Sequence, residues 1–205
     1  VGIDLGLKDF VITSDNKKFK NNRYITKYTK QLKKAQRHLS RKQKGSNGFE
    51  KQKLKVAKIH EKIANCRLDT LHKVSKELVK SYDLISVEDL NVKGMIKNRK
   101  LSKHIADASW GKFVTLLQYK CDWYGKELVK VNRFYPSSKT CSECGWINQE
   151  LKLSDREWTC NSCGAIHNRD WNASKNILKE GLKIISAGTV DYTDGVIDRP
   201  SRYYF

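Results

Sequence analysis

The first half of the chain alternates short strand patterns with long helical ones. "VGIDLGLKDFVITSD" predicts two strands joined by a turn, because strand-forming residues lie on both sides of "GLKD". "KKFK" predicts a third, short strand. "YTKQLKKAQRHLSRKQKGSNG" contains helix formers up to Lys44 and is then broken by Gly, Ser and Asn. A second helix is predicted from about Phe49 to Tyr82.

Apolar residues in this second helix recur at helical spacing. They form one stripe, which consists of Val56, Ile59, Ile63, Leu71, Val74 and Leu78. Lys and Arg occupy most of the remaining helix surface. The pattern therefore predicts a helical hairpin over about residues 27–82, with one side packed and the other side basic.

The second half continues the alternation of strands and helices. "LISVEDL" is an uninterrupted apolar run, typical of a strand inside a sheet, and "KELVKVNRFY" predicts another strand. Between them, "DASWGKFVTLLQYKCDWYG" predicts an amphipathic helix that ends at Gly125. Its apolar face comprises Phe113, Leu116, Leu117, Cys121 and Tyr124. A last helix is predicted over "AIHNRDWNASKNILKEGL", ending at Gly181, and residues 186–205 are expected to be an irregular tail.

Positive charge is concentrated in the predicted hairpin. The 205 residues carry a formal net charge of +19, and residues 17–80 hold 21 Lys and Arg against four acids, which is +17 of that total. Phosphate is the usual partner for a field this strong, so we expect nucleic acid to bind there. A merely solvated basic face and an anionic membrane surface are the alternatives. No run of eighteen apolar residues is present that would span a membrane.

Four cysteines have the spacing of a zinc ribbon. Cys141 and Cys144 form one CxxC pair, and Cys160 and Cys163 form a second pair fifteen residues later. The glycine after each pair permits the tight turn that points two thiolates at one ion. Four thiolates at about 2.3 Å fill a tetrahedral shell, so we predict a structural Zn²⁺. Two disulfides are the alternative. His167, which follows the second pair, is a candidate to stabilise the exit of the ribbon.

Three acids occur at the ends of separate predicted elements. Asp4 follows "VGI", Glu88 follows "LISV", and Asp170 lies at the start of the last helix. Taken singly, they suit a turn, a strand end and a helix cap. Glu88 is preferred over Asp89, because neighbouring strand residues point to opposite faces.

A single pocket for these acids would need cations. Neighbouring carboxylates repel one another, and hard divalent cations such as Mg²⁺ or Mn²⁺ relieve that repulsion. Two such ions about 4 Å apart clamp the attacking water and the leaving oxygen in phosphodiester hydrolysis. The basic protein would deliver the phosphate to them.

These features together resemble the RuvC-type nuclease domain of the TnpB family, RNA-guided nucleases encoded by insertion sequences and related to type V CRISPR effectors. The resemblance rests on "GIDLGLKDF", "VEDLN", "CSECG…CNSCG", "HNRDWNASKNI" and the basic helical segments, and it covers roughly residues 1–185. It implies an α/β fold of RNase H-like (RuvC) type: a mixed sheet with helices, a basic helical-hairpin insertion and an inserted zinc ribbon.

The resemblance also implies how the chain is divided. Residues 1–139 would form the first part of the nuclease core, including the insertion at about 27–82. Residues 140–164 would form the zinc ribbon, and 165–185 the last part of the core with the third acid. The irregular tail would follow at 186–205.

Roles for particular residues follow from the same resemblance. Asp4, Glu88 and Asp170 would bind catalytic Mg²⁺ (or Mn²⁺), and the four cysteines would bind structural Zn²⁺. The family cuts double-stranded DNA with a guide RNA, so guide RNA and target DNA are the expected partners. Phosphate contacts on the hairpin are expected from Lys33, Lys34, Arg37, Arg41, Lys42 and Lys44.

The chain is expected to be a piece of a longer protein. Family members carry an N-terminal region that recognises a short motif beside the target and grips the guide, whereas Val1 already lies inside a strand pattern. We therefore expect missing N-terminal domains and a fragment that is inactive by itself. The resemblance implies a cytoplasmic, nucleoid-associated prokaryotic protein that contacts no membrane. Its oligomeric state is open.

Three other functions are weighed against a metal-dependent endonuclease. A nuclease-inactive, guide-directed DNA-binding protein would usually lack one of the acids. A transposase or a junction resolvase on the same fold would also use clustered acids. A zinc-ribbon RNA-binding structural protein would explain the charge and the cysteines, but it leaves Asp4 and Glu88 without a role beyond packing.

Overall fold

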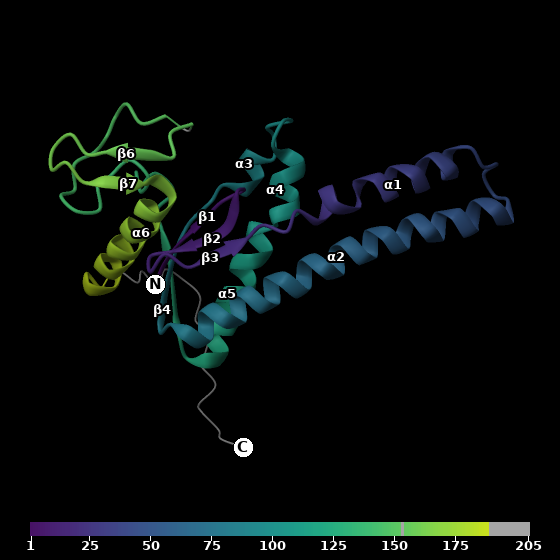
Figure 1. The fold of residues 1–205 in the computed structure, drawn as a ribbon. Helices are drawn as coiled ribbons and strands as arrows, with labels where there is room; N and C mark the ends of the chain where they lie inside the picture. The colour runs from purple at the N-terminus through teal and green to yellow at the C-terminus, as the bar shows by residue number, and fades with distance from the viewer. Residues whose placement is uncertain (153, 189–205) are drawn as a thin grey trace, which may run out of the picture.

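The computed structural model describes residues 1–152 and 154–188, and it is built around one mixed sheet (Figure 1). Its strands are β1 (Gly2–Leu5), β2 (Asp9–Thr13), β3 (Lys18–Lys20), β4 (Leu84–Glu88) and β5 (Glu127–Val131), in the order β3-β2-β1-β4-β5. The first three pair antiparallel, because tight turns join them. β4 and β5 run parallel to β1, because each is reached by a helical crossover. All five strands were predicted.

The predicted helical hairpin is present and projects away from the sheet (Figure 1). It consists of α1 (Tyr24–Ser40) and α2 (Asn47–Ser81), and the Ser46 side chain caps α2 by accepting from the Phe49 amide. The apolar stripe is buried only from Ile63 onward, where α2 reaches the core. Val56 and Ile59 remain partly exposed, because only α1 packs beside that part of α2.

Three further helices connect β4 to β5: α3 (Val92–Met95), α4 (Ser102–Ala108) and α5 (Trp110–Tyr124). The predicted amphipathic helix is α5, and Phe113, Leu116, Leu117 and Cys121 of its apolar face are buried. Tyr124 was predicted to be buried with them, but 48% of it is exposed, because it is the last residue before the helix stops at Gly125. The buried faces of α2, α4 and α5 pack with Ile3, Val11, Ile85 and Val87 of the sheet to form the main core.

The remaining elements are a two-stranded sheet, β6 (Glu157–Thr159) and β7 (Ile166–Asn168), and helix α6 (Arg169–Ser186). The prediction that α6 ends at Gly181 is wrong, since the helix continues to Ser186. Gly181 instead allows α6 to pack closely on β4: a Cβ there would lie 2.7 Å from the Ser86 Cβ. Gly2 of β1 does the same, since its Cβ would lie 2.8 Å from the Leu178 Cβ.

Of the predicted irregular tail at 186–205, residues 189–205 lie outside the described residues. Among the helices of the described part, none is long and apolar enough to cross a lipid bilayer.

Candidate metal and nucleic-acid site

Asp4 and Glu88 lie side by side at the carboxyl ends of two adjacent parallel strands. β1 and β4 are in register with Ile3 opposite Val87, so the next pair along is Asp4 and Glu88. Gly2 and Ser86 face α6, and side chains two residues apart share a face of a strand. Both acids therefore face the side of the sheet that α6 covers.

Asp170 approaches the same edge from the first turn of α6. The helix is capped by Asn168, whose side chain accepts from the Trp171 amide, so the capping role considered for Asp170 is already filled. Asp170 instead accepts hydrogen bonds from Arg169, at 2.9 Å from Nε and 2.8 Å from Nη2, and from Arg156 Nη1 at 3.1 Å. Its side chain is only 19% exposed.

The three acids interact electrostatically. Burial and the nearby carboxylates of Asp170 and Glu88 raise the pKa of Asp4 to about 7. Burial, followed by the neighbouring Asp89, also raises the pKa of Glu88. Burial is the largest cause of both shifts, and the contributions of Asp170 and Glu88 to the pKa of Asp4 indicate that the fold brings these negative charges near one another, a condition that favours binding of a divalent cation.

Asp4, Asp9 and Asp170 line one cavity of about 710 Å³, and most of its other polar lining is basic. The cationic residues that line it are Lys8, Arg23, Lys139, Lys152, Arg156 and Arg169. A cavity with acids at its base and cations around them suits a phosphodiester, because metal ions can meet the phosphate at the acids while the surrounding cations hold the flanking phosphates.

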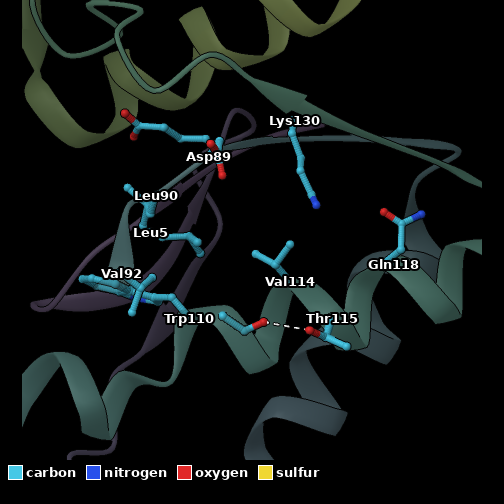
Figure 2. A pocket seen from close by; sticks show the side chains of 11 residues that line it. Leu5, Asp89, Leu90, Val92, Trp110, Val114, Thr115, Gln118 and Lys130 are labelled. Atoms are coloured by element: carbon cyan, nitrogen blue, oxygen red, sulfur yellow. Dashed lines mark hydrogen bonds between the residues drawn. The ribbon is translucent and has the colours of Figure 1, made fainter. Parts of the chain in front are cut away.

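Glu88 and Asp89 line a second cavity of about 340 Å³, and neither of them lines the cavity of Asp4 and Asp170 (Figure 2). The Asp89 carboxylate pairs with Arg133, and the walls of this cavity include Leu5, Val92 and Trp110. In Figure 2 the side chain of Lys130 extends from β5 toward this cavity, and Thr115 and Gln118 face it from α5. Asp89 thus has a cationic partner of its own, away from Asp4 and Asp170.

The four cysteines converge as tightly as a zinc site requires. Their Sγ atoms all lie within 4.8 Å of one another. Among the described residues, no other group of three or more candidate metal ligands converges in this way. Cys141 Sγ lies 3.7 Å from Cys163 Sγ, and Cys144 Sγ lies 3.6 Å from Cys160 Sγ. Tetrahedral Zn–S bonds of about 2.3 Å place sulfurs about 3.8 Å apart, whereas a disulfide needs about 2.05 Å. The four thiols therefore fit Zn²⁺ and are not disulfide-bonded.

His167 lies against this cluster. It is 5% exposed, its ring is tilted against Trp158 with centroids 4.7 Å apart, and its Nε2 lies 3.0 Å from Cys141 Sγ. Burial lowers the pKa of His167, which favours a neutral ring with one N–H available to donate to sulfur. The residue that was considered for the exit of the ribbon thus contacts a predicted zinc ligand directly.

The cations predicted to contact phosphate lie elsewhere. Lys33, Lys34 and Arg37 are exposed on α1, and Arg41, Lys42 and Lys44 are exposed in the turn that follows it. This is the end of the hairpin that projects from the sheet (Figure 1). The basic residues nearest the acids, Arg156 and Arg169, were not predicted to bind phosphate. Each is next to an aspartate in the sequence: Arg156 in "SDREW" and Arg169 in "HNRD". Their proximity depends on the β6–β7 pairing, which places the Arg169 amide 2.8 Å from the Arg156 carbonyl.

Asp4 should make stability depend on pH. Its folded-state pKa of about 7 lies above its ordinary value of 3.8, so its charged form is disfavoured in the folded state. The penalty is absent below pH 4, grows between pH 4 and 7, and is complete above pH 7. At pH 8, in buffer without Mg²⁺ or Mn²⁺ and with the zinc retained, Asp4→Asn should therefore raise the free energy of unfolding. The increase should be at most about 4 kcal/mol for a three-unit pKa shift. Urea titrations of both proteins at pH 4, 6 and 8 measure this; equal stability of the two at pH 8 would contradict it.

Comparisons with known proteins match the chain in two consecutive parts. Residues 1–99 match a family described as "Probable transposase", and residues 110–177 match a family described as "Cas12f1-like, TNB domain". One solved structure, a Cas12f1–sgRNA–target DNA complex, has a similar fold with a TM-score of 0.63 and 20% identity; the alignment covers 86% of this chain and 48% of that one.

Curated relatives match nearly the whole chain. A Streptomyces pristinaespiralis protein named "Putative RNA-guided DNA endonuclease" is 45% identical over 98% of this chain and 48% of its own length. An Escherichia coli K12 protein named "Putative RNA-guided DNA endonuclease InsQ" is 34% identical over 92% of this chain and 50% of its own. A TnpB-like protein of Acanthamoeba polyphaga mimivirus is 36% identical over 89% of this chain and 37% of its own.

The chain spans about half the length, or less, of these relatives. The matched segments include the two strands that end in Asp4 and Glu88, the four cysteines and the helix that begins beside Asp170. Together these matches show that the chain belongs to the TnpB family.

Proposed function

We propose that this chain is the catalytic part of an RNA-guided, Mg²⁺-dependent DNA endonuclease, and that Asp4, Glu88 and Asp170 bind its catalytic cations. The observation that carries the proposal is the crowding of these carboxylates. Asp4 and Glu88 end adjacent parallel strands on the α6 side of the sheet, and the charges of Glu88 and Asp170 help to raise the pKa of Asp4 to about 7. A cation would neutralise this cluster.

The geometry favours a pair of cations over a single one. Oxygens that share one Mg²⁺ lie within about 4.2 Å of each other, because each bond is about 2.1 Å. The carboxylate oxygens of the three acids are not gathered closely enough to share one ion; among the described residues only the four cysteines form such a group. Two cations about 4 Å apart accept ligands spread over roughly 8 Å, which suits acids delivered from β1, β4 and α6. Mn²⁺ would occupy the same oxygen sites.

In this mechanism the protein supplies position and charge. Bound cations would activate the attacking water and stabilise the leaving oxygen. Asp4 and Glu88 hold fixed positions on the sheet, and α6 brings Asp170 to them. Arg156 and Arg169, which now pair with Asp170, line the same cavity and would be available to the substrate phosphates. Lys139 and Lys152 extend that basic wall.

The same proposal assigns the rest of the chain. The sheet order with parallel β1, β4 and β5 supports an RNase H-like core made of residues 1–139 and 165–185, interrupted by a zinc ribbon at 140–164. The hairpin cations Lys33, Lys34, Arg37, Arg41, Lys42 and Lys44 would hold the guide–target heteroduplex by its phosphates. Guide RNA and target DNA are the proposed partners because the relatives, of about twice this length, carry the name "Putative RNA-guided DNA endonuclease".

A cation-binding measurement tests the proposal on this chain alone. Mn²⁺ titration at pH 8, followed by the EPR signal of the free ion, should show binding by the zinc-loaded chain. Asp4→Asn should weaken it at least about tenfold, since it removes one charged ligand. Asp89→Asn is the matched control, because it removes a neighbouring carboxylate that already pairs with Arg133. Equal Mn²⁺ affinity of the wild type and Asp4→Asn would refute the proposal.

A further inference from the structure

We propose that the metal held by the four cysteines sets the position of Asp170, so that the zinc ribbon and the third acid form one coupled unit. His167, Asn172 and Asn176 are the positioning residues that join them. The inference rests on the proposed function only where it calls Asp170 a catalytic ligand. The coupling itself is a property of the contacts between the ribbon and α6.

Two buried asparagines of α6 form hydrogen bonds with the backbone segment that leads into the first CxxC turn. Asn172 donates from Nδ2 to the Thr140 carbonyl at 2.7 Å, and its Oδ1 accepts from the Ser142 amide at 2.9 Å. One side chain thus grips the backbone on both sides of Cys141. Asn176, one turn later, donates to the carbonyls of Thr140 at 2.6 Å and Ser137 at 2.8 Å. Each asparagine is only 2% exposed, so water cannot replace these partners.

The third link is His167, three residues before Asp170 on β7. Its Nε2 lies 3.0 Å from Cys141 Sγ. A neutral imidazole that donates to a metal-bound thiolate stabilises the charge on sulfur and fixes the ring. Cys141 is therefore tied to the chain both before Asp170, by His167, and after it, by Asn172.

A fourth link reaches Asp170 itself. Arg156 lies at the entrance to β6 inside the ribbon, and its Nη1 lies 3.1 Å from the Asp170 carboxylate. Its carbonyl accepts from the Arg169 amide at 2.8 Å, which extends the β6–β7 pairing up to the acid. Residues beside the first cysteine pair and at the start of β6 thus surround the first turn of α6. Because the ribbon has little apolar core of its own, its metal is expected to determine whether these contacts form.

The physical consequence is cooperativity between two metal sites that share no ligand. A metal in the ribbon should order the first turn of α6 and so favour cation binding at Asp170. By thermodynamic reciprocity, a cation at the acids should tighten metal binding in the ribbon by the same factor. Changing an outer-shell partner of a metal site typically weakens its affinity 10- to 100-fold, and we expect that range for His167.

The first test needs no catalytic cation. Amide hydrogen exchange is measured on the zinc-loaded chain and on the chain treated with a zinc chelator. Exchange at Asp170–Asn172 should accelerate at least tenfold without zinc, while β1 and β4 stay protected. Unchanged protection at Asp170–Asn172, together with loss of protection at Cys141–Cys144, would overturn the proposal. If chelation unfolds the sheet as well, the zinc-loaded variants below decide the outcome.

Those variants separate the hydrogen bond from general packing. His167→Phe keeps a ring against Trp158 but removes the donor to Cys141, whereas His167→Gln keeps an N–H donor. With Co²⁺ in place of Zn²⁺, His167→Phe should shift the sulfur-to-cobalt charge-transfer band and speed exchange at Asp170, and His167→Gln should restore both toward the wild type. Asn161→Ala is the control, because Asn161 is an exposed ribbon asparagine between Cys160 and Cys163. Wild-type exchange at Asp170 in His167→Phe would contradict the coupling.

A second arm distinguishes this inference from the proposed function. The Mn²⁺ affinity of the wild type is compared with that of His167→Phe, both loaded with zinc. If exchange at Asp170 is faster in His167→Phe than in the wild type, but the wild type binds no Mn²⁺, the coupling is supported and the cation site is refuted. Tight Mn²⁺ binding that is identical in both proteins, with identical exchange, would support the cation site and refute the coupling.

Discussion

Glu88→Gln is expected to abolish DNA cleavage by the complete protein that contains this chain, with guide RNA, target DNA and Mg²⁺ present. The substitution keeps the size and shape of the side chain at the end of β4 and removes only its charge. A cation held by two acids in place of three loses several kcal/mol of stabilisation of the transition state. At 1.36 kcal/mol per factor of ten, the single-turnover rate should fall by at least about a thousandfold.

Binding of target DNA should change little in the same variant, because most of the basic charge lies on the hairpin and around the cavity. Asp89→Asn is the control for a nearby loss of charge: Asp89 lines the same cavity as Glu88, but its carboxylate already pairs with Arg133, so cleavage should stay within a few fold of the wild type. A Glu88→Gln protein that cuts at the wild-type rate would exclude Glu88 from the catalytic set.

Removing zinc is expected to unfold the ribbon. Among the described residues of this segment, the buried apolar cluster consists of Cys141, Trp158 and Cys160, two of which are predicted ligands. Structural zinc sites of this kind contribute about 10–16 kcal/mol of binding free energy at pH 7, which far exceeds what so small a core supplies. Chelation, or Cys160→Ser, should therefore abolish protease resistance between residues 137 and 168 while the main sheet persists.

The measurement is limited proteolysis with mass spectrometry of the fragments, in parallel with zinc analysis of the protein. Cys66→Ser provides the control, because this partly buried thiol lies on α2 and outside the cluster. It should retain one zinc per chain and wild-type protection. Intact protection of the ribbon in a zinc-free sample would show that the apolar contacts and the asparagine clamps suffice without metal.

Sequence patterns predicted the five strands of the main sheet and the main helices because their physical signals are local, whereas the short strands β6 and β7 were not predicted. The apolar run "LISV" and the cysteine spacing are complete within a few residues, and each determines one element or one site. The acids were proposed as a set because each lies at the end of a separate predicted element, and the resemblance to a family then assigned their roles. Their proximity depends on the β1–β4 register and on the packing of α6, and neither is encoded near Asp4.

The errors have the same origin. Gly181 looks like a helix stop when its neighbours in sequence are considered, but its role is the close approach to Ser86 of β4. Two of the six residues of the apolar stripe on α2, Val56 and Ile59, remain partly exposed, because helical spacing does not reveal where the sheet ends. The basic rim of Arg23, Lys139 and Arg156 comes from three distant segments and has no common motif. Long-range juxtaposition is thus the information that local patterns lack.

The position of β1 at the middle of the sheet has a consequence for synthesis on the ribosome. When β1 leaves the exit tunnel, its parallel partner β4 is still about 80 residues downstream, and α6, the helix that covers its acid, follows roughly another 80 residues after that. Asp4 therefore waits, without its partners, until nearly the whole described chain has emerged. Under the proposed function, the cation site of a nascent chain is incomplete until α6 docks, and termination of synthesis before that point should yield a product that cannot cut.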